Sequence, residues 1–265
     1  MNPRLFIAAL TLIALAQPSS AHISFKTRDL GTFDGTSAVS VTIDNQTVPN
    51  NSGWADGTYP ALADSHKVRA FRFTLSAPAT ITLAVAAHPA ATDKSIGGLL
   101  PAFSLYAGLP HLPPEALDYD RAPITSAWLA TLAAPQPKIG AFDALHTFRI
   151  GNDTSQPSAG GSYDFSALST LTFVGYAADG SPANLGTGSG ATGDGQPDGR
   201  TTGTWQLPAG SYTVFVGGAD HAHREKSGLG YGIAVTLKIT PPPATAASAV
   251  QNSHKPAAYQ ENGKP

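Results

Sequence analysis

The sequence predicts an all-β protein, a loop-rich antiparallel β-sandwich of about nine strands. Short stretches in which apolar and polar residues alternate recur along the chain, and no stretch keeps the 3.6-residue period of an amphipathic helix. The chain of 265 residues also contains 27 glycines and 22 prolines, which supply the turns that many short strands require.

The alternating stretches give the expected strands. The clearest are "KVRAFRFTLS", "ATITLAVAA", "TGTWQLPAGSYTVFVGG" and "YGIAVTLKIT", and weaker ones are "SAVSVTID", "AFSLYAG", "HTFRIG" and "TLTFVGYA". The turn sequences "SAPA" and "PAGS" each separate two strands, so we expect a β-hairpin at each. Only "PPEALDYD" is expected to start a short helix, because proline is tolerated in the first turn.

The two ends of the chain differ from this pattern. Arg4, the apolar run "LFIAALTLIALA", and the small residues Ser19 and Ala21 are typical of an export signal with cleavage after residue 21. A retained membrane anchor is the alternative, although the run is too short for a span. We therefore expect a signal peptide at 1–21, a sandwich domain at 22–240 and a disordered tail or tether at 241–265.

The amino-acid composition limits the classes of function that the protein can have. The absence of cysteine excludes disulfides and a thiol nucleophile, and a net charge of −2 argues against a nucleic-acid partner. No G-x-S-x-G elbow is present, and "GTGSGATG" is a weak phosphate-loop match, so we do not expect an enzyme. Cleavage after residue 21 would remove Met1, the only methionine, so a soft metal would have to bind through imidazole.

Histidine is therefore the candidate metal ligand. The eight histidines are His22, His66, His88, His111, His146, His221, His223 and His254, and for any one of them an ordinary hydrogen-bonded role is the simpler interpretation. His66 precedes a strong strand, and His111 follows one and is flanked by prolines that restrict its backbone. Two opposed imidazoles suit two-coordinate Cu(I), whereas zinc usually takes more ligands.

Several stretches resemble a known family. They are "AHISFKTRDLGTF", "GWADGTYPALADSHKVRAFRFTLSAPATITL", "PAFSLYAGL", "LTFVGYAADGSPANLGTGSGATGDGQPDGRTTGTWQLPAGSYTVFVGGAD" and "YGIAVTLKIT". Together they resemble the secreted copper-binding proteins of methane-oxidising bacteria, the MopE/CorA type, over most of 22–240. The resemblance implies a surface-exported, loop-rich β-sandwich that holds Cu(I) by two histidines and by kynurenine made from an oxidised tryptophan.

The resemblance assigns the histidine ligands to His66, in "DSH", and His111, after "SLYAGL". The tryptophan departs from the family pattern, because Phe71 stands where an aromatic residue is expected after His66, and the nearest tryptophan is Trp54. Coordination by two histidines with a weak third ligand is therefore the expectation.

Two further histidine sites are weighed against simpler interpretations. His221 and His223 are one residue apart, a spacing that places two imidazoles on one side of an extended chain. With Arg224 and Lys226 close by, we favour a solvated loop pair over a secondary metal site. A mature N-terminus at His22 could form a histidine brace and make the protein a copper oxidoreductase, which is the enzyme alternative.

Two long loops, 110–138 and 178–202, separate the expected strands. The second is rich in glycine and aspartate, and Asp179, Asp194 and Asp198, with Asn184, are candidate Ca²⁺ ligands; a plain flexible loop is equally compatible.

The sequence thus predicts an exported, non-catalytic Cu(I)-binding protein of the secreted, cell-surface or periplasmic space. Copper is the expected ion, calcium is a second candidate, and an outer-membrane or cell-surface protein is the candidate partner. Besides the copper-binding protein and the copper oxidoreductase, a third class of function is a metal-free structural or carbohydrate-binding β-sandwich.

Overall fold

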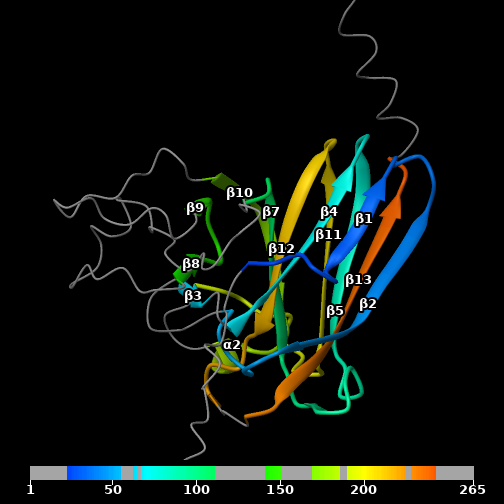
Figure 1. Cartoon of the computed structure of the whole chain (residues 1–265). Coiled ribbons are helices and arrows are strands. Elements are labelled where there is room, and N and C mark those ends of the chain that lie inside the picture. The colour runs from blue at the N-terminus through cyan, green and yellow to red at the C-terminus, as the bar shows by residue number, and fades with distance from the viewer. Residues whose placement is uncertain are drawn as a thin grey trace, which may run out of the picture.

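The computed structural model describes residues 23–54, 62–64, 67–110, 141–150, 169–185, 190–224 and 228–242. These ranges form an all-β sandwich of two main sheets (Figure 1). The expectations for the signal peptide, for a helix at 113–120 and for nearly all of the tail lie outside the described residues. No helix in the described ranges has the length and apolar character needed to cross a membrane.

The strands pair mostly antiparallel. The six-stranded sheet contains, in spatial order, β1 (Asp29–Phe33), β4 (Arg69–Leu75), β12 (Gly210–Gly218), β7 (Pro101–Ala107), β10 (Ser169–Ala178) and β9 (Phe148–Ile150). The five-stranded sheet contains β11 (Arg200–Leu207), β5 (Ala79–Ala87), β13 (Gly230–Thr240) and β2 (Val39–Val48), and β6 (Ser95–Ile96) pairs with β13. The strands β3 (Leu62–Asp64) and β8 (Ala141–Asp143) form a small separate sheet, and α2 (Pro182–Leu185) is a single helical turn.

All nine expected strands are present, and the described residues add four short ones, β1, β3, β6 and β8. The loop at 178–202 is also more ordered than a plain loop, since it contains α2 and is fixed by backbone hydrogen bonds such as that from Asp194 N–H to the Ala178 carbonyl, 3.0 Å.

Both expected hairpins are wrong. The turn after Leu75 carries the chain from β4 in the six-stranded sheet to β5 in the five-stranded sheet, and the turn after Leu207 carries it from β11 to β12 in the opposite direction. The apolar faces of all four strands pack into one core between the sheets, with Phe73 and Leu83 fully buried there. Alternation satisfies either connection, so it does not distinguish a hairpin from a link between sheets.

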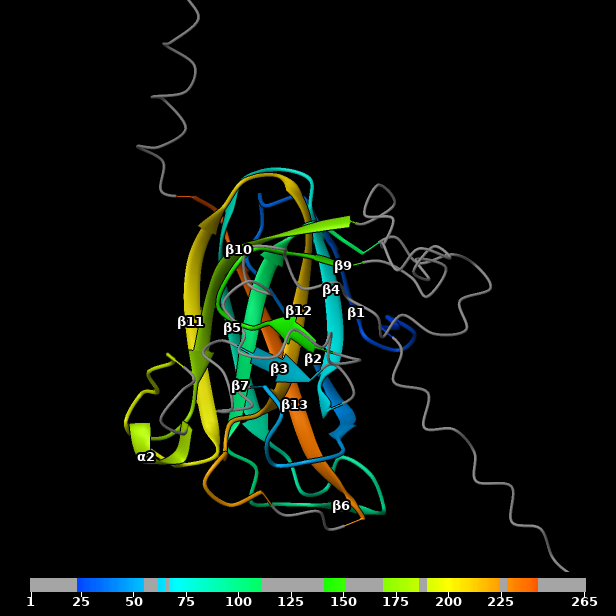
Figure 2. The same cartoon turned by 90° about the vertical axis from the view of Figure 1, so that its left-hand side faces the viewer.

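A second apolar cluster covers the outer face of the six-stranded sheet. Tyr106 on β7 and Phe215 on β12 point away from the central core and contact each other with ring centroids 5.8 Å apart. Figure 2 looks onto this face and shows β3 and β8 lying across β7 and β12. The outer face of this sheet is therefore apolar. The outer face of the five-stranded sheet is polar, and there Thr82 and Thr204 form a hydrogen bond across strands.

Candidate functional site

The leading ligands predicted from sequence, His66 and His111, lie outside the described residues, as do His22 and His254. The described residues next to His66 and His111 in the chain show which parts of the fold lead to these positions.

The chain that leads to His66 is fastened to the end of β12. Residues 50–54 cross that end, where Trp54 N–H donates to the Gly218 carbonyl at 3.1 Å and Asp220 N–H donates to the Asn51 carbonyl at 2.9 Å. The approach is so close that a Cβ on Gly218 would lie 2.2 Å from the backbone of Asn51. Glycine is therefore required here by the contact between the two backbones.

Trp54 is a fully buried residue of the apolar cluster on the outer face of the six-stranded sheet. Its Nε1–H donates to Ser104 Oγ at 2.8 Å, and Ser104 donates in turn to the Ala144 carbonyl. Its ring lies 5.5 Å from that of Tyr176. A tryptophan held in this way serves as a packing residue with a satisfied N–H.

The residues on either side of positions 65 and 66 are also anchored. Asp64 N–H donates to the Gly53 carbonyl at 2.8 Å, and the Asp64 carboxylate forms an ion pair with Lys67 at 3.1 Å. The Asp64 side chain is only 10% exposed, so this ion pair is screened less than a surface pair. The chain just before position 65 and just after position 66 therefore has a defined position on the outer face of the six-stranded sheet.

The described residues near His66 and His111 lie toward different ends of the six-stranded sheet. Arg69, three residues after His66, pairs with Val216, whereas Gly108, three residues before His111, donates to the Ser211 carbonyl. At about 3.3 Å per residue these two levels of β12 are about 17 Å apart. A copper ion shared by the two histidines therefore requires the chain next to one of them to return along the sheet.

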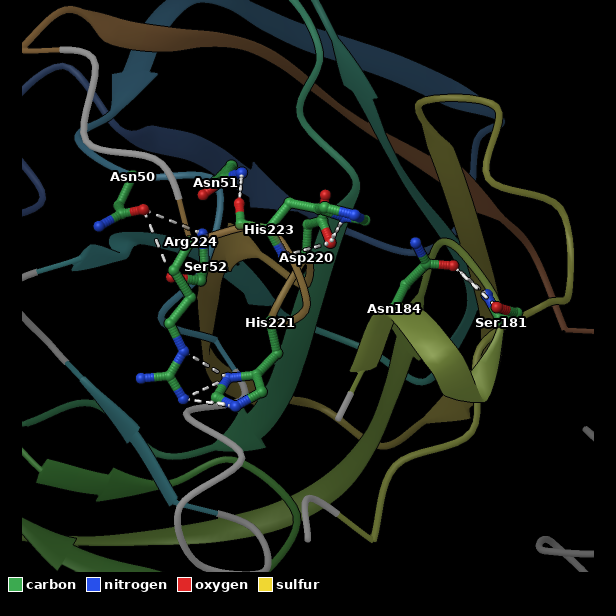
Figure 3. A network of polar contacts seen from close by, with 9 residues as sticks. All are labelled: Asn50, Asn51, Ser52, Ser181, Asn184, Asp220, His221, His223 and Arg224. Carbon is green, nitrogen blue, oxygen red and sulfur yellow. Dashed lines mark hydrogen bonds and ion pairs between the residues drawn. The ribbon is translucent and has the colours of Figure 1, made fainter. Parts of the chain in front are cut away.

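His221 and His223 do not converge. Residues 221–224 form a turn, so the alternation of an extended chain does not apply, and Figure 3 shows the two rings on different sides of the loop. His223 Nδ1 lies 3.1 Å from the carboxylate of Asp220, and its side chain is 71% exposed. The guanidinium of Arg224 donates to His221 Nδ1 at 3.0 Å, so a cation would have to displace it. A secondary metal site at His221 and His223 therefore has no support from this geometry and stays a prediction.

A buried polar cluster behind this turn escaped the sequence analysis. Asn50, Asn51 and Ser52 are each at least 95% buried, and Asn51 donates through its side chain to the His223 carbonyl (Figure 3). Among the described residues the Asn51 Oδ1 atom has no hydrogen-bond partner. In the sequence, "NNSG" has the composition of an exposed turn, and nothing in it signals burial.

The aspartates proposed for calcium organise their own loop. Asp179 is fully buried, and its two carboxylate oxygens accept the N–H groups of Asp198 at 3.1 Å and Gly199 at 2.7 Å. Asp194 accepts from Gly180 and Gln196. Burial, more than the neighbouring carboxylates, raises the pKa of Asp179 to about 6. Carboxylates that already accept backbone N–H groups give no support for calcium, and the calcium site stays a prediction.

The two remaining described histidines, His146 and His88, do not belong to a group of metal-ligating side chains among the described residues. His146 is 69% exposed and its Nδ1 lies 3.1 Å from the Asp143 carboxylate, while His88 is half-buried beside β13. Within the described ranges, no group of three or more histidine, aspartate or glutamate side chains is arranged to hold a metal ion.

The two sheets, with the apolar cluster that covers the outer face of the six-stranded sheet, define the structural class of the protein as a β-sandwich with a third layer of loops. No protein-family model matches the sequence, and no curated protein matches it either.

Two solved structures are similar in shape. One is CorA, a surface-associated copper-binding protein important in copper acquisition by Methylomicrobium album BG8; it is 14% identical, the match covers 78% of this chain and 96% of CorA, and the TM-score is 0.39. The other is MopE, a secreted protein of Methylococcus capsulatus in which an oxidised tryptophan facilitates copper binding; it is 17% identical, with 81% and 87% covered and a TM-score of 0.36. Both are of the type that the sequence resembles. At these TM-scores neither assigns a residue role to this chain.

Proposed function

We propose that this protein is exported and binds copper, which it captures or buffers without catalysing a reaction. The proposal is supported by the sequence stretches that resemble secreted copper-binding proteins and by the signal-like residues 1–21. The lack of cysteine and the single methionine at position 1 leave imidazole as the soft-metal ligand of the mature chain.

The observation that carries the proposal is the chain around His66. The stretch from Trp54 to Lys67 belongs to the resemblance, and its described parts are held by a buried indole, a backbone hydrogen bond and a partly buried ion pair. A metal ligand benefits from such anchoring, because fixed neighbours reduce the conformational entropy lost on binding.

His66 and His111 are the proposed ligands, and Cu(I) is the proposed oxidation state, because two imidazoles satisfy its low coordination number. His221, His223 and His22 are secondary. The receiving partner would be a protein of the outer membrane or cell surface.

The test is to measure copper per chain in the mature protein after dialysis. We expect His66→Ala and His111→Ala each to lose most of the copper, since a two-coordinate ion cannot keep its geometry with one ligand. His146→Ala is the control, because it removes an exposed imidazole that is not one of the proposed ligands, and it should retain full copper.

Retention should also weaken below roughly pH 6, where imidazole becomes protonated. If both single variants keep full copper while an extension before His22 removes it, the copper site is the N-terminal brace. A protein that binds no copper belongs to the metal-free class.

A further inference from the structure

Two arginines lie at the open side of the sandwich, where β1 and β4 face β2. Arg28 precedes β1 and Arg69 begins β4, and both side chains are half-buried. Arg28 donates to the carbonyls of Ser24 and Ala70 at 2.6–3.2 Å, and to the side-chain oxygen of Gln46 on β2 at 3.2 Å. The guanidinium of Arg28 is therefore fixed beside the backbone of Ala70, the residue that follows Arg69.

The guanidinium of Arg69 has few partners. Its hydrogen bond among the described residues is to the neighbouring Val68 carbonyl, at 3.1 Å, although a guanidinium carries five N–H donors. No described carboxylate pairs with Arg69 or Arg28. Among the described residues, most of the donors on Arg69 are therefore left without an acceptor.

The contrast with Arg72 shows that this arrangement is unusual. The side chain of Arg72 is 42% exposed and has a carboxylate partner, with its Nε and Nη2 atoms 2.8 and 2.7 Å from Asp29 Oδ2. Buried charges are normally the ones that are paired, because they lose more hydration. Among the described residues, Arg72 has a carboxylate counter-ion, whereas Arg28 and Arg69, which burial desolvates, do not.

The electrostatics agree with this geometry. Burial and, to a smaller extent, the positive charge of Arg28 together lower the pKa of Arg69 to about 10. Burial also lowers the pKa of Arg28. Two neighbouring cations that repel each other in a partly desolvated position are stabilised by an anion placed between them.

We propose that Arg69, supported by Arg28, forms an anion site at this edge that binds an oxyanion group, either a carboxylate or a phosphate. The planar fork of a guanidinium donates two parallel hydrogen bonds to two oxygens of such groups, whereas a spherical halide offers a single acceptor atom. The residues involved are separate from those proposed for copper, so the site operates with or without the metal.

The test is calorimetric titration of copper-free, full-length mature protein with inorganic phosphate and with acetate, in a chloride buffer of matched ionic strength. We expect saturable binding of at least one of them, and the stronger binder identifies the group. Arg69→Met keeps much of the apolar stem and should weaken binding by about tenfold or more, since charged hydrogen bonds are lost. Arg200→Met changes an exposed arginine on β11 and should bind as the wild type does.

Arg69→Lys provides a second variant in case Arg69→Met does not fold. It keeps the charge but loses the fork, so it should bind more weakly than the wild type. Absence of saturable binding by both anions, or equal binding by wild type and the folded Arg69 variants, would overturn the proposal, and the stem of Arg69 would then simply carry its charge to solvent.

Discussion

Replacement of Gly218 by alanine tests whether residues 50–54 are held against β12. The new Cβ would lie 2.2 Å from both the carbonyl carbon and oxygen of Asn51, and 2.8 Å from its Cα. These are backbone atoms, so no side-chain rotation relieves the overlap. The phi angle of Gly218 is not positive, so the expected effect comes from the contact alone.

The magnitude follows from what the overlap displaces. Overpacking costs about 1–3 kcal/mol. The displaced segment also carries two hydrogen bonds between Gly218, Trp54, Asn51 and Asp220, each contributing about 1 kcal/mol. We expect Gly218→Ala to lower the free energy of unfolding by about 3–5 kcal/mol.

Urea unfolding followed by tryptophan fluorescence measures this change. Gly97→Ala is the matched control, because its Cβ would meet Pro89 Cγ at 3.0 Å, a contact that a change of ring pucker can relieve, and no backbone atom within 4 Å, so a loss below about 1 kcal/mol is expected. If the two variants unfold at the same urea concentration, residues 50–54 do not lie where the structure places them.

Two further predictions concern the loop from Asp179 to Gly199. The pKa of Asp179 is raised from 3.8 to about 6, so protonation of this carboxyl stabilises the folded state. This contribution to the free energy of unfolding is complete below pH 3.8 and is lost as the pH rises through about 6. After solvent screening the loss amounts to about 1–2 kcal/mol. The difference in unfolding free energy between wild type and Asp179→Asn, measured from pH 4 to 7, should therefore vary with pH, and a constant difference would contradict this account. If the loop binds calcium, millimolar Ca²⁺ should raise the melting temperature relative to excess chelator. An unchanged melting temperature would rule calcium out.

The sequence predicted the strands well wherever one face alone is buried. Ile81, Leu83 and Val85 on β5 and the same pattern on β13 gave clear alternation. The strands β3 and β6 are too short to show a period. The apolar run "YTVFVGG" in β12 did contain a signal that was overlooked, because a continuous apolar run is typical of a strand covered on both faces.

The arrangement of the candidate site was less accessible to sequence. The turn at 221–224 separates two histidines that an extended chain would bring together, and the strand register places the approaches to His66 and His111 at different levels of one sheet. The hydrogen bond from the Asn51 side chain to the His223 carbonyl joins residues 172 positions apart. Such relations arise from tertiary packing, and no local pattern encodes them.

The two links that cross between the sheets have a consequence for folding. Among the described strands, β2 pairs with β13, β5 with β11, and β4 with β12, so each partner lies more than a hundred residues away along the chain. Loop-closure entropy must be overcome before such contacts form, and domains with this high contact order fold slowly. Neither sheet can be completed before the last third of the chain is present. If the protein is exported, as we propose, a nascent chain that lacks β11 to β13 cannot complete either sheet and can pass through a membrane before it folds.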